Sequence, residues 1–178
     1  MYPFFRMMRS RSIARSQPPI GVTDIHVSHH ICWPWDLDPW VELNNGRTMT
    51  MFDLGRLGMM ERMGLVDALR RNGWGFTVAG STVRYRRRVQ MWDRMEMRSR
   101  IASMDRRFFY VEQSIRVRGD ACSHALLRIA MTDGHIVPPE RAVEVMPELA
   151  RLPALEDWAR AWSEAEDLRP WPPMTLRD

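Results

Sequence analysis

The sequence predicts an α+β fold in which one long helix packs against a curved antiparallel sheet. Two observations predict this class. An apolar stripe at helical spacing runs through residues 45–63, and four consecutive segments rich in Val, Ile, Phe, Tyr and Thr follow it, separated by short polar turns. The chain has 178 residues, 45% of them hydrophobic, which is enough for one domain with a substantial core.

The first twenty residues differ in composition from the rest. They carry Arg6, Arg9, Arg11 and Arg15 and no acidic residue. They lack an apolar h-region and a small-residue cleavage site, so no secretory signal is predicted, although an organellar transit peptide has a similar composition. We expect residues 1–20 to form a basic, flexible arm ahead of the folded domain at residues 21–139. Residues 140–178 are then expected to form a helical extension packed on the same domain.

The first regular elements are a strand and the long helix. Alternation predicts a half-buried strand, with one face made of Ile25, Val27, His29 and Ile31. Helical spacing then places one apolar stripe on the long helix, made of Phe52, Gly55, Met59 and Met63. Asn44 or Asn45 can cap this helix and Gly64 can end it. Gly55 and Gly58 lower helix propensity, which suggests that another backbone packs closely against the helix.

A short helix at residues 66–71 precedes the strands, which we predict at residues 76–89, 95–104, 107–118 and 121–132. One face and the edges of the resulting sheet are left for a partner subunit. The rest of the chain, residues 141–168, is acidic and helical, with breaks near Pro147 and Pro153. Its apolar stripe is expected to dock on the body of the domain and consists of Leu155, Trp158, Trp162 and Ala165.

Composition excludes several kinds of chemistry. All 26 basic residues are arginine, so neither a Schiff-base lysine nor a Walker A lysine is available. Cys32 and Cys122 are too few for a disulfide framework or a metal cluster, which favours a reducing cytoplasm. No apolar run approaches the roughly 20 residues needed to span a bilayer, so no membrane insertion is expected.

The charge is unevenly distributed. Residues 84–118 hold eleven arginines against four acidic residues, a net charge of +7, whereas residues 140–178 hold nine acidic residues against five arginines. A basic block favours an anionic partner, either a phosphate-bearing small molecule or nucleic acid. A solvated face of the sheet explains the same block equally well.

The segment before the long helix carries the strongest functional signal. Asp36 and Asp38 stand one residue apart, a Pro-Trp turn follows, and Asn44-Asn45 opens the helix. A helix start offers free backbone N–H groups and partial positive charge. A carboxylate beside such a group of donors is the minimum needed to attack a carbonyl, because the donors stabilise the oxyanion that forms.

These residues resemble a known family. Asp-x-Asp followed by Asn-Asn is similar to the hotdog-fold acyl-CoA thioesterases of the 4-hydroxybenzoyl-CoA thioesterase type, whose segment typically reads W-x-D-x-D-x-x-G-H-x-N-N-x-x-Y. Asp53 and Arg56 also fall where the family helix often has an acid and then arginine. A second block resembles the thioesterase superfamily member 6-like branch and comprises residues 83–87, residues 98–101, Asp105 and residues 108–112. The resemblance spans roughly residues 22–135.

The resemblance implies a hotdog-fold homodimer or homotetramer that hydrolyses an acyl-CoA and needs no cofactor beyond the CoA of its substrate. It makes Asp38 the catalytic carboxylate, as nucleophile or general base, and places the carbonyl oxygen at the helix start near Asn45. Asp36 is interpreted as a structural turn residue. The expected substrate-binding residues are Trp40, Glu42, Asn44, Arg86, Arg87 and Arg106, with the arginines on the CoA phosphates. The acyl channel is expected along the methionines of the helix, whose flexible thioethers favour aliphatic chains.

The sequence departs from the family pattern at three positions. Val41-Glu42 replaces the family's Gly-His, and Thr48 replaces its tyrosine. These changes favour one alternative, a hotdog protein that binds acyl-CoA without hydrolysing it. A nucleic-acid-binding module is a second alternative. A dehydratase is disfavoured because no His–Asp or His–Glu pair is recognisable, and no metal site is expected because His29 points away from His26 and His30.

Overall fold

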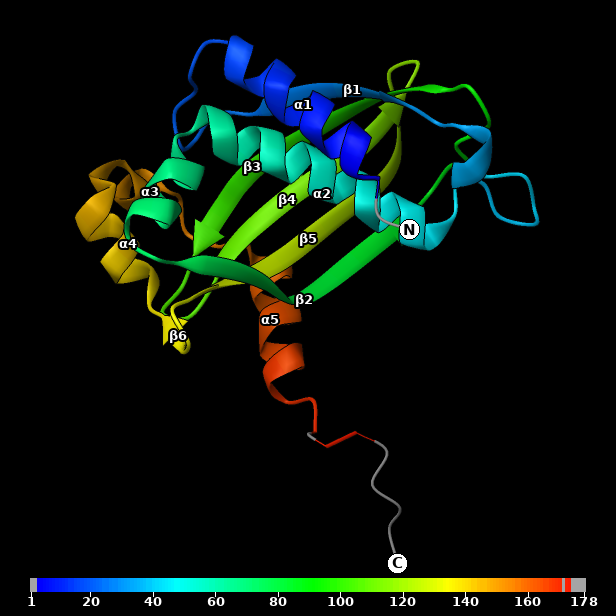
Figure 1. Ribbon diagram of the computed structural model, residues 1–178. Coiled ribbons are helices and arrows are strands. Elements are labelled where there is room, and N and C mark those ends of the chain that lie inside the picture. Colours follow the sequence, from blue (N-terminus) through cyan, green and yellow to red (C-terminus); the bar gives the residue numbers. More distant parts are fainter. Residues whose placement is uncertain (1–2, 171, 174–178) are drawn as a thin grey trace, which may run out of the picture.

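A curved antiparallel sheet wraps around the long helix α2 (Asn45–Arg62), which Figure 1 shows from the helix side. This computed structural model describes residues 3–170 and 172–173. The sheet follows the order β1-β3-β4-β5-β2, and β6 pairs with β5. Its strands are β1 (His26–Ile31), β2 (Gly75–Tyr85), β3 (Arg94–Met104), β4 (Phe109–Val117), β5 (Asp120–Thr132) and β6 (Ile136–Val137). The predicted class and the helix-on-sheet layering are therefore confirmed.

Helix α2 begins and ends at the predicted positions. The Asn44 side chain caps it by accepting hydrogen bonds from the N–H groups of Gly46 (2.8 Å) and Arg47 (3.2 Å). At the other end Gly64 adopts the left-handed conformation with φ of 73°, and the short helix α3 (Leu65–Arg71) follows. The predicted apolar stripe of α2 is buried against the sheet.

We expected another backbone to pack closely against the glycines of α2. Side chains of the sheet pack there instead. A Cβ added at Gly55 would lie 2.6 Å from the Met97 side chain, and one added at Gly58 would lie 2.8 Å from Nε2 of His26. Both neighbours stand on strands beneath the helix. The close approach is therefore between helix and sheet, within one core.

Strand β1 exists as predicted, but its apolar face is turned outward. His26 is 2% exposed and lies under Gly58, whereas Ile25, just before the strand, is 51% exposed. Burial, reinforced by the guanidinium of Arg62, lowers the pKa of His26 from 6.5 to about 4. Gly58 on α2 makes room for a neutral imidazole, which the alternation of the strand could not reveal.

The buried histidine makes stability depend on pH. The folded state favours neutral His26, so the unfolded chain binds a proton first as the pH falls below 6.5. We expect the free energy of unfolding to drop by about 2 kcal/mol between about pH 7 and about pH 5 from this residue alone. Urea denaturation across this range measures the drop, and a His26→Gln variant should show a shallower dependence. An equally steep profile in that variant would contradict the assignment.

The first residues are helical, which corrects the expectation of a flexible arm at residues 1–20. Helix α1 (Phe4–Ser16) packs along α2 (Figure 1), and two of its arginines pair with an acid of that helix. Arg11 and Arg15 pair with Glu61 at 2.5 and 3.0 Å, and the Glu61 side chain is only 6% exposed. The basic composition that suggested disorder instead supplies partners for buried acids of the body. Residues 1 and 2 lie outside the described part of the chain.

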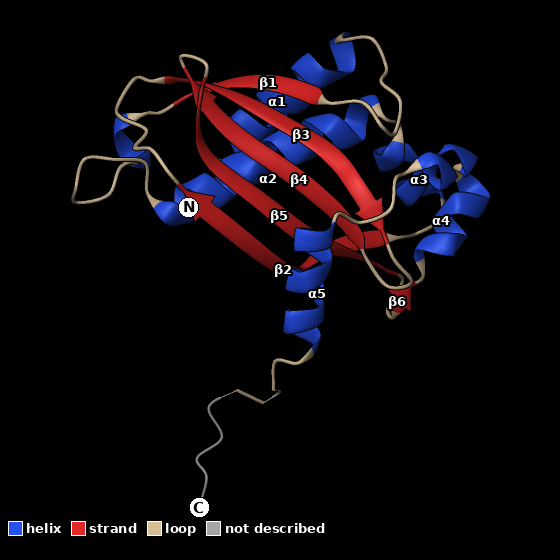
Figure 2. Cartoon of the chain, turned by 180° about the vertical axis from the view of Figure 1, so that it is seen from behind, coloured by secondary structure: helices blue, strands red, loops and turns tan. Residues whose placement is uncertain are grey.

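The C-terminal segment is helical and broken at Pro147 and Pro153, as predicted. It forms α4 (Pro139–Val145), the 3-10 turn η2 (Pro147–Arg151) and α5 (Asp157–Asp167). Figure 2 shows α5 against the outer face of the sheet, where Ala159 packs with a small cluster made of Phe108, Tyr110, Leu126 and Ala130.

The docked face of α5 matches the predicted stripe only in part, because Leu155 and Trp162 pack against this cluster. Ala159 and Ser163 are buried, whereas Trp158 is 44% exposed and Ala165 is also exposed. The docked face also makes polar contacts, because the Tyr110 hydroxyl lies 2.7 Å from the Ser163 hydroxyl and donates to Asp105 at 2.6 Å. Across the described residues, no helix combines the length and apolarity needed to cross a bilayer.

Candidate functional site

The segment between β1 and α2 folds back on itself as a tight loop at the N-terminal end of α2 (Figure 1). Leu37 and Leu43 form an isolated antiparallel bridge across its base. The Val41 N–H donates to the Asp38 carbonyl at 3.0 Å, and the Asp38 N–H donates to the Glu42 carbonyl at 2.9 Å. We call residues 33–44 the Asp38 loop.

The Asp38 carboxylate is half-buried and held by the backbone of this loop. Its Oδ1 accepts hydrogen bonds from the N–H groups of Trp40 (2.9 Å) and Glu42 (3.4 Å). This is the geometry of a turn-capping aspartate. Its Oδ2 has no hydrogen bond to any described residue, so one carboxylate oxygen stays available to a substrate or a water molecule.

The helix start offers fewer free donors than the sequence suggested. The N–H groups of Gly46 and Arg47 are taken by the Asn44 side chain, and that of Thr48 bonds to the Asn44 carbonyl. Among the described residues, the exposed Asn45 N–H has no such partner. Asn44 is therefore the cap, and the Asn45 N–H is the helix-start donor that no described residue occupies.

Asp36 has a structural position at the base of the loop. It is 1% exposed, and its Oδ2 accepts from the Trp33 N–H at 3.0 Å and from the Arg6 guanidinium at 2.7 Å. Its carbonyl accepts the Asn44 N–H at 2.9 Å. Asp36 thus ties together both ends of the Asp38 loop. Nothing in the sequence could have indicated Arg6 as its partner, because 30 residues separate the two.

The two residues that depart from the family pattern take particular conformations. Val41 has a φ of 60°, in the left-handed region that glycine adopts without strain. Glu42 Oε2 lies 2.8 Å from Arg88 Nε, but the two are not aligned for a hydrogen bond, so the contact is an ion pair. Valine thus stands at a strained position of the turn, and the second carboxylate is paired with Arg88.

Replacing Val41 with glycine should therefore stabilise the protein. The left-handed conformation costs an L-residue roughly 1–2 kcal/mol, more than the entropy that glycine loses on folding. We expect Val41→Gly to raise the free energy of unfolding by up to about 1 kcal/mol in urea denaturation. Val41→Ala is the matched control, because it keeps a Cβ and should gain less. Destabilisation by glycine would contradict the strain at this position.

The candidate CoA-binding arginines lie at two ends of the sheet. Arg86 and Arg87 follow β2 beside the Asp38 loop, where the Leu43 N–H donates to the Val89 carbonyl at 2.8 Å. The Arg86 side chain is exposed, and Arg87 pairs with Asp120 at 2.6 Å. Arg106 lies in the turn after β3, at the opposite end of a strand roughly 30 Å long. The structure therefore brings Arg86 and Arg87 to the loop, but not Arg106.

Two further residues complete the surroundings of the loop. Trp40, at the tip of the Asp38 loop, is 71% exposed. Arg88, the partner of Glu42, was missed by sequence reasoning, although it stands in the same run of arginines as Arg86 and Arg87. The only signal that could have indicated it was the opposite charge of Glu42.

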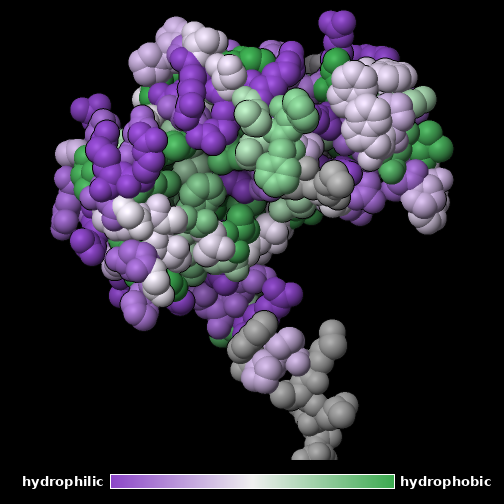
Figure 3. All heavy atoms as spheres, in the orientation of Figure 1, coloured by the Kyte–Doolittle hydropathy of each residue, from purple (hydrophilic) through white to green (hydrophobic). Residues whose placement is uncertain are grey.

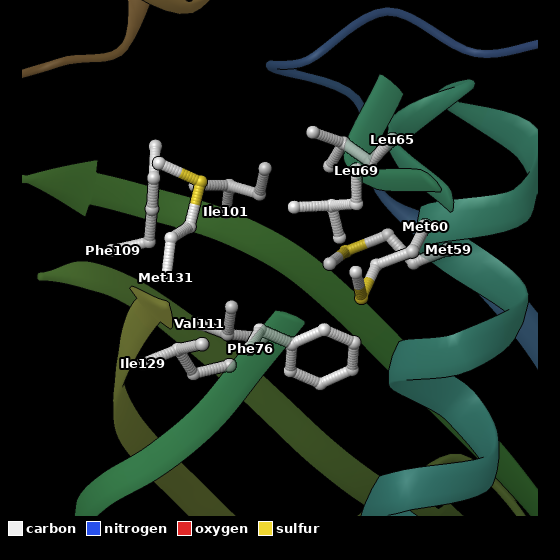
Figure 4. Close-up of a pocket in the computed structure, with 10 residues that line it drawn as sticks. All are labelled: Met59, Met60, Leu65, Leu69, Phe76, Ile101, Phe109, Val111, Ile129 and Met131. Carbon is white, nitrogen blue, oxygen red and sulfur yellow. The ribbon is translucent and has the colours of Figure 1, made fainter. Parts of the chain in front are cut away.

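An apolar pocket lies under the C-terminal end of α2 (Figure 4). Its empty volume, including the open mouth, is about 430 Å³, and no polar side chain lines it. Met59 is 14 residues beyond Asn45, so this pocket is about 21 Å along the helix from the Asp38 loop. The lining residues are Met59, Met60, Leu65, Leu69, Phe76, Ile101, Phe109, Val111, Ile129 and Met131.

A buried polar cluster lies between these two sites. Arg56 is 3% exposed, and it donates to Gln113 Oε1 at 3.2 Å and pairs with Asp53. Gln113 Nε2 donates in turn to the Ser99 hydroxyl and to the Phe52 carbonyl, both at 2.8 Å. The Arg56 Nε–H has no hydrogen-bond partner in the described part of the chain. The acid and arginine noted on the helix therefore form an ion pair in which the arginine is buried and the acid is partly exposed.

A histidine–carboxylate pair does exist, contrary to the expectation from sequence. His124 Nε2 lies 2.8 Å from Glu112 Oε1, and Arg100 also pairs with that carboxylate. Because β4 and β5 are neighbours, the pair crosses between strands and leaves no local pattern. It lies on the outer face of the sheet, away from α2 and the Asp38 loop. No three His, Cys, Asp or Glu side chains of the described residues gather as a metal site.

Sequence comparisons place most of the chain in one family. A family model described as the thioesterase-like superfamily matches residues 32–163. Protein THEM6 of Xenopus laevis is 33% identical over 136 residues, covering 75% of this chain and 64% of that protein. Protein THEM6 of Drosophila melanogaster is 25% identical over 150 residues, covering 83% and 76%. The chain thus spans less than two thirds of the length of the Xenopus relative.

Solved structures share the fold. The probable thioesterase YbaW of Escherichia coli superimposes with a TM-score of 0.65 at 17% identity, covering 70% of this chain and 98% of that one. DHNA-CoA thioesterase of Staphylococcus aureus superimposes with a TM-score of 0.60 at 15% identity, covering 81% and 92%. At such identities the likeness establishes the arrangement of helix and sheet.

Proposed function

This chain belongs to the thioesterase-like superfamily, and from that premise we propose that it hydrolyses an acyl-CoA thioester to the free acid and CoA. The observation that carries the proposal is the Asp38 carboxylate, held by two loop N–H groups with its Oδ2 free, beside the start of α2. The thioesterases among its structural neighbours, one of them named for an acyl-CoA, agree with this substrate class.

In the proposed reaction, Asp38 acts on the thioester carbonyl as a nucleophile, through a mixed anhydride, or as a general base toward water. The Asn45 N–H at the positive end of α2 polarises the carbonyl oxygen and stabilises the tetrahedral oxyanion. The CoA thiol has a pKa near ~8.5, so it leaves without strong acid assistance. The reaction needs no metal and no cofactor besides the CoA of the substrate.

The CoA moiety is assigned to the arginines beside the loop. Arg86 and Arg87 extend the β2 end next to Asp38, and planar guanidinium groups suit phosphate oxygens. Arg86 is the better candidate, because Arg87 already pairs with Asp120. Trp40 at the loop tip is positioned to cover the ligand. Arg106 lies at the far end of the sheet within one chain, so its assignment to the CoA phosphates stays a prediction that depends on the partner subunit.

We assign the acyl chain to the apolar pocket, and the homodimer brings pocket and loop together. Strand β2 is an 11-residue edge strand with unpaired backbone groups and exposed Val78 and Tyr85, and such edges favour pairing with a second copy. Figure 3 shows hydrophobic residues gathered over α2 and the adjoining sheet on this side. When two copies of β2 pair in antiparallel orientation, the Gly75 end of one strand meets the Tyr85 end of the other. The pocket of one subunit lies at the Gly75 end, and the Asp38 loop of the other subunit lies at the Tyr85 end.

This geometry favours aliphatic acyl groups. The pocket has no polar lining atom to receive a hydroxyl, and flexible methionines can adapt to chains of different shape. A panel of acyl-CoAs, assayed by release of free thiol, tests the proposal. We expect hydrolysis of aliphatic substrates at higher kcat/KM than of hydroxybenzoyl-CoA. Absence of turnover across the panel would refute the thioesterase assignment.

A second candidate is a hotdog protein that binds acyl-CoA without turnover. The specific observation in its favour is that Asn44 occupies two of the helix-start donors, with Val41-Glu42 in place of Gly-His. Binding of acyl-CoA by calorimetry without thiol release would support it.

Nucleic-acid binding has less support, because many arginines of the basic block are paired with acidic residues. Such pairs join Arg87 to Asp120, Arg88 to Glu42, Arg98 to Glu96 and Arg100 to Glu112.

A further inference from the structure

Helix α1, which lies ahead of the matched family region, contacts the Asp38 loop through the side chain of Arg6. Arg6 donates from Nη1 to Asp36 Oδ2 at 2.7 Å and from Nη2 to the Ile31 carbonyl at 2.5 Å. The Arg6 side chain is 18% exposed and that of Asp36 is 1% exposed. The contact is therefore a largely buried ion pair between the N-terminal helix and the base of the loop.

Asp36 transmits this contact to the rest of the loop. Its carboxylate binds the N–H of Trp33 at the start of the loop, and its carbonyl binds the N–H of Asn44 at the end. Asn44 then caps α2 and precedes the Asn45 donor. A buried carboxylate that loses its cation leaves a costly uncompensated charge, so the loop would rearrange to hydrate Asp36.

We propose that Arg6 is a positioning residue of the candidate site: helix α1 fixes the Asp38 loop in the shape that presents Asp38 beside the start of α2. The expected effect of Arg6 on the reaction rate rests on the proposed thioester hydrolysis, whereas its effect on the loop does not. Arg6 touches neither Asp38 nor Asn45 in the described contacts, so it acts through Asp36.

The chain provides a matched control on the same helix. Arg11 also joins α1 to the body by an ion pair, with Glu61 at 2.5 Å, but Glu61 belongs to the far end of α2. Arg11→Gln therefore weakens the docking of α1 without touching the loop. Comparing it with Arg6→Gln separates loop positioning from general attachment of the helix.

Hydrogen–deuterium exchange of the 178-residue chain tests the loop directly. In Arg6→Gln we expect faster exchange at the loop amides that the structure shows bonded, namely those of Asp38, Val41, Leu43 and Asn44. Arg11→Gln should leave their exchange unchanged. Equal exchange of these amides in the two variants would overturn the proposal, whether or not the protein has thioesterase activity.

Kinetics supply the second readout. Arg6→Gln should lower kcat by roughly tenfold or more with a smaller change in KM, since misplaced reacting groups slow the chemical step. Arg6→Lys keeps a cation for Asp36 and should recover part of the loss. In an Asp36→Asn background, Arg6→Gln should have a much smaller effect, because the two residues act as a pair. If the effects of Arg6→Gln and Asp36→Asn on kcat were fully additive, transmission through Asp36 would be refuted. If the wild type shows no turnover but Arg6→Gln shows the predicted faster exchange of the loop amides, only the proposed function is refuted.

Discussion

Replacing Asp38 with asparagine is expected to lower kcat for acyl-CoA hydrolysis by about 10²- to 10⁴-fold. The substitution removes the charge needed by a nucleophile or a general base. It keeps an oxygen that can accept the Trp40 and Glu42 N–H groups, which lie 2.9 and 3.4 Å from Asp38 Oδ1. The loop should therefore keep its shape, and thiol-release kinetics with a melting curve of the same sample separate lost chemistry from lost structure.

The neighbouring acid offers a matched control for this variant. Glu42 belongs to the same loop, but its carboxylate is paired with Arg88. Glu42→Gln is an equally conservative change, and we expect kcat to stay within a few-fold of the wild type. Hydrolysis that survives Asp38→Asn would exclude Asp38 as the catalytic carboxylate. A large loss in Glu42→Gln instead would transfer that role to Glu42.

Local signals in the sequence were sufficient for the elements that frame the site. The extent of α2 and the capping role of Asn44 follow from residues within one turn of the helix ends, which is the range over which capping acts. The strands β3, β4 and β5 were recognisable from composition and short turns. The resemblance of the Asp38 loop to a known thioesterase segment agrees with the family match over residues 32–163.

Contacts that depend on strand register or on distant segments were not predictable. The inward face of β1 carries His26 because Gly58 leaves space for it, and the two are 32 positions apart. Arg6 and Asp36 meet because α1 packs along α2, and His124 meets Glu112 because β4 and β5 are neighbours. Charge composition alone assigned the N-terminal arginines to a flexible arm. Buried acidic partners on α2 and in the Asp38 loop give them a fixed place.

The largest expected effect on stability concerns the Asp53–Arg56 ion pair of α2, in which only the arginine is buried. The Arg56 side chain is 4% exposed and that of Asp53 is 37% exposed. Asp53→Ala leaves the buried guanidinium with Gln113 as its remaining described hydrogen-bond partner, a neutral group that cannot balance its charge. We expect Asp53→Ala to lower the free energy of unfolding by about 3 kcal/mol.

Replacing Arg56 should lower the free energy of unfolding less than replacing Asp53 does. Arg56→Met fills a similar volume with an apolar chain and leaves Asp53 free to be hydrated, so the main loss is the hydrogen bond to Gln113, roughly 1 kcal/mol. Urea denaturation of both variants and of the double variant Asp53→Ala/Arg56→Met gives the comparison. The double variant should be more stable than Asp53→Ala alone, because it removes the unpaired buried charge. A larger loss in Arg56→Met than in Asp53→Ala would mean that packing of the arginine, not its charge balance, dominates at this position.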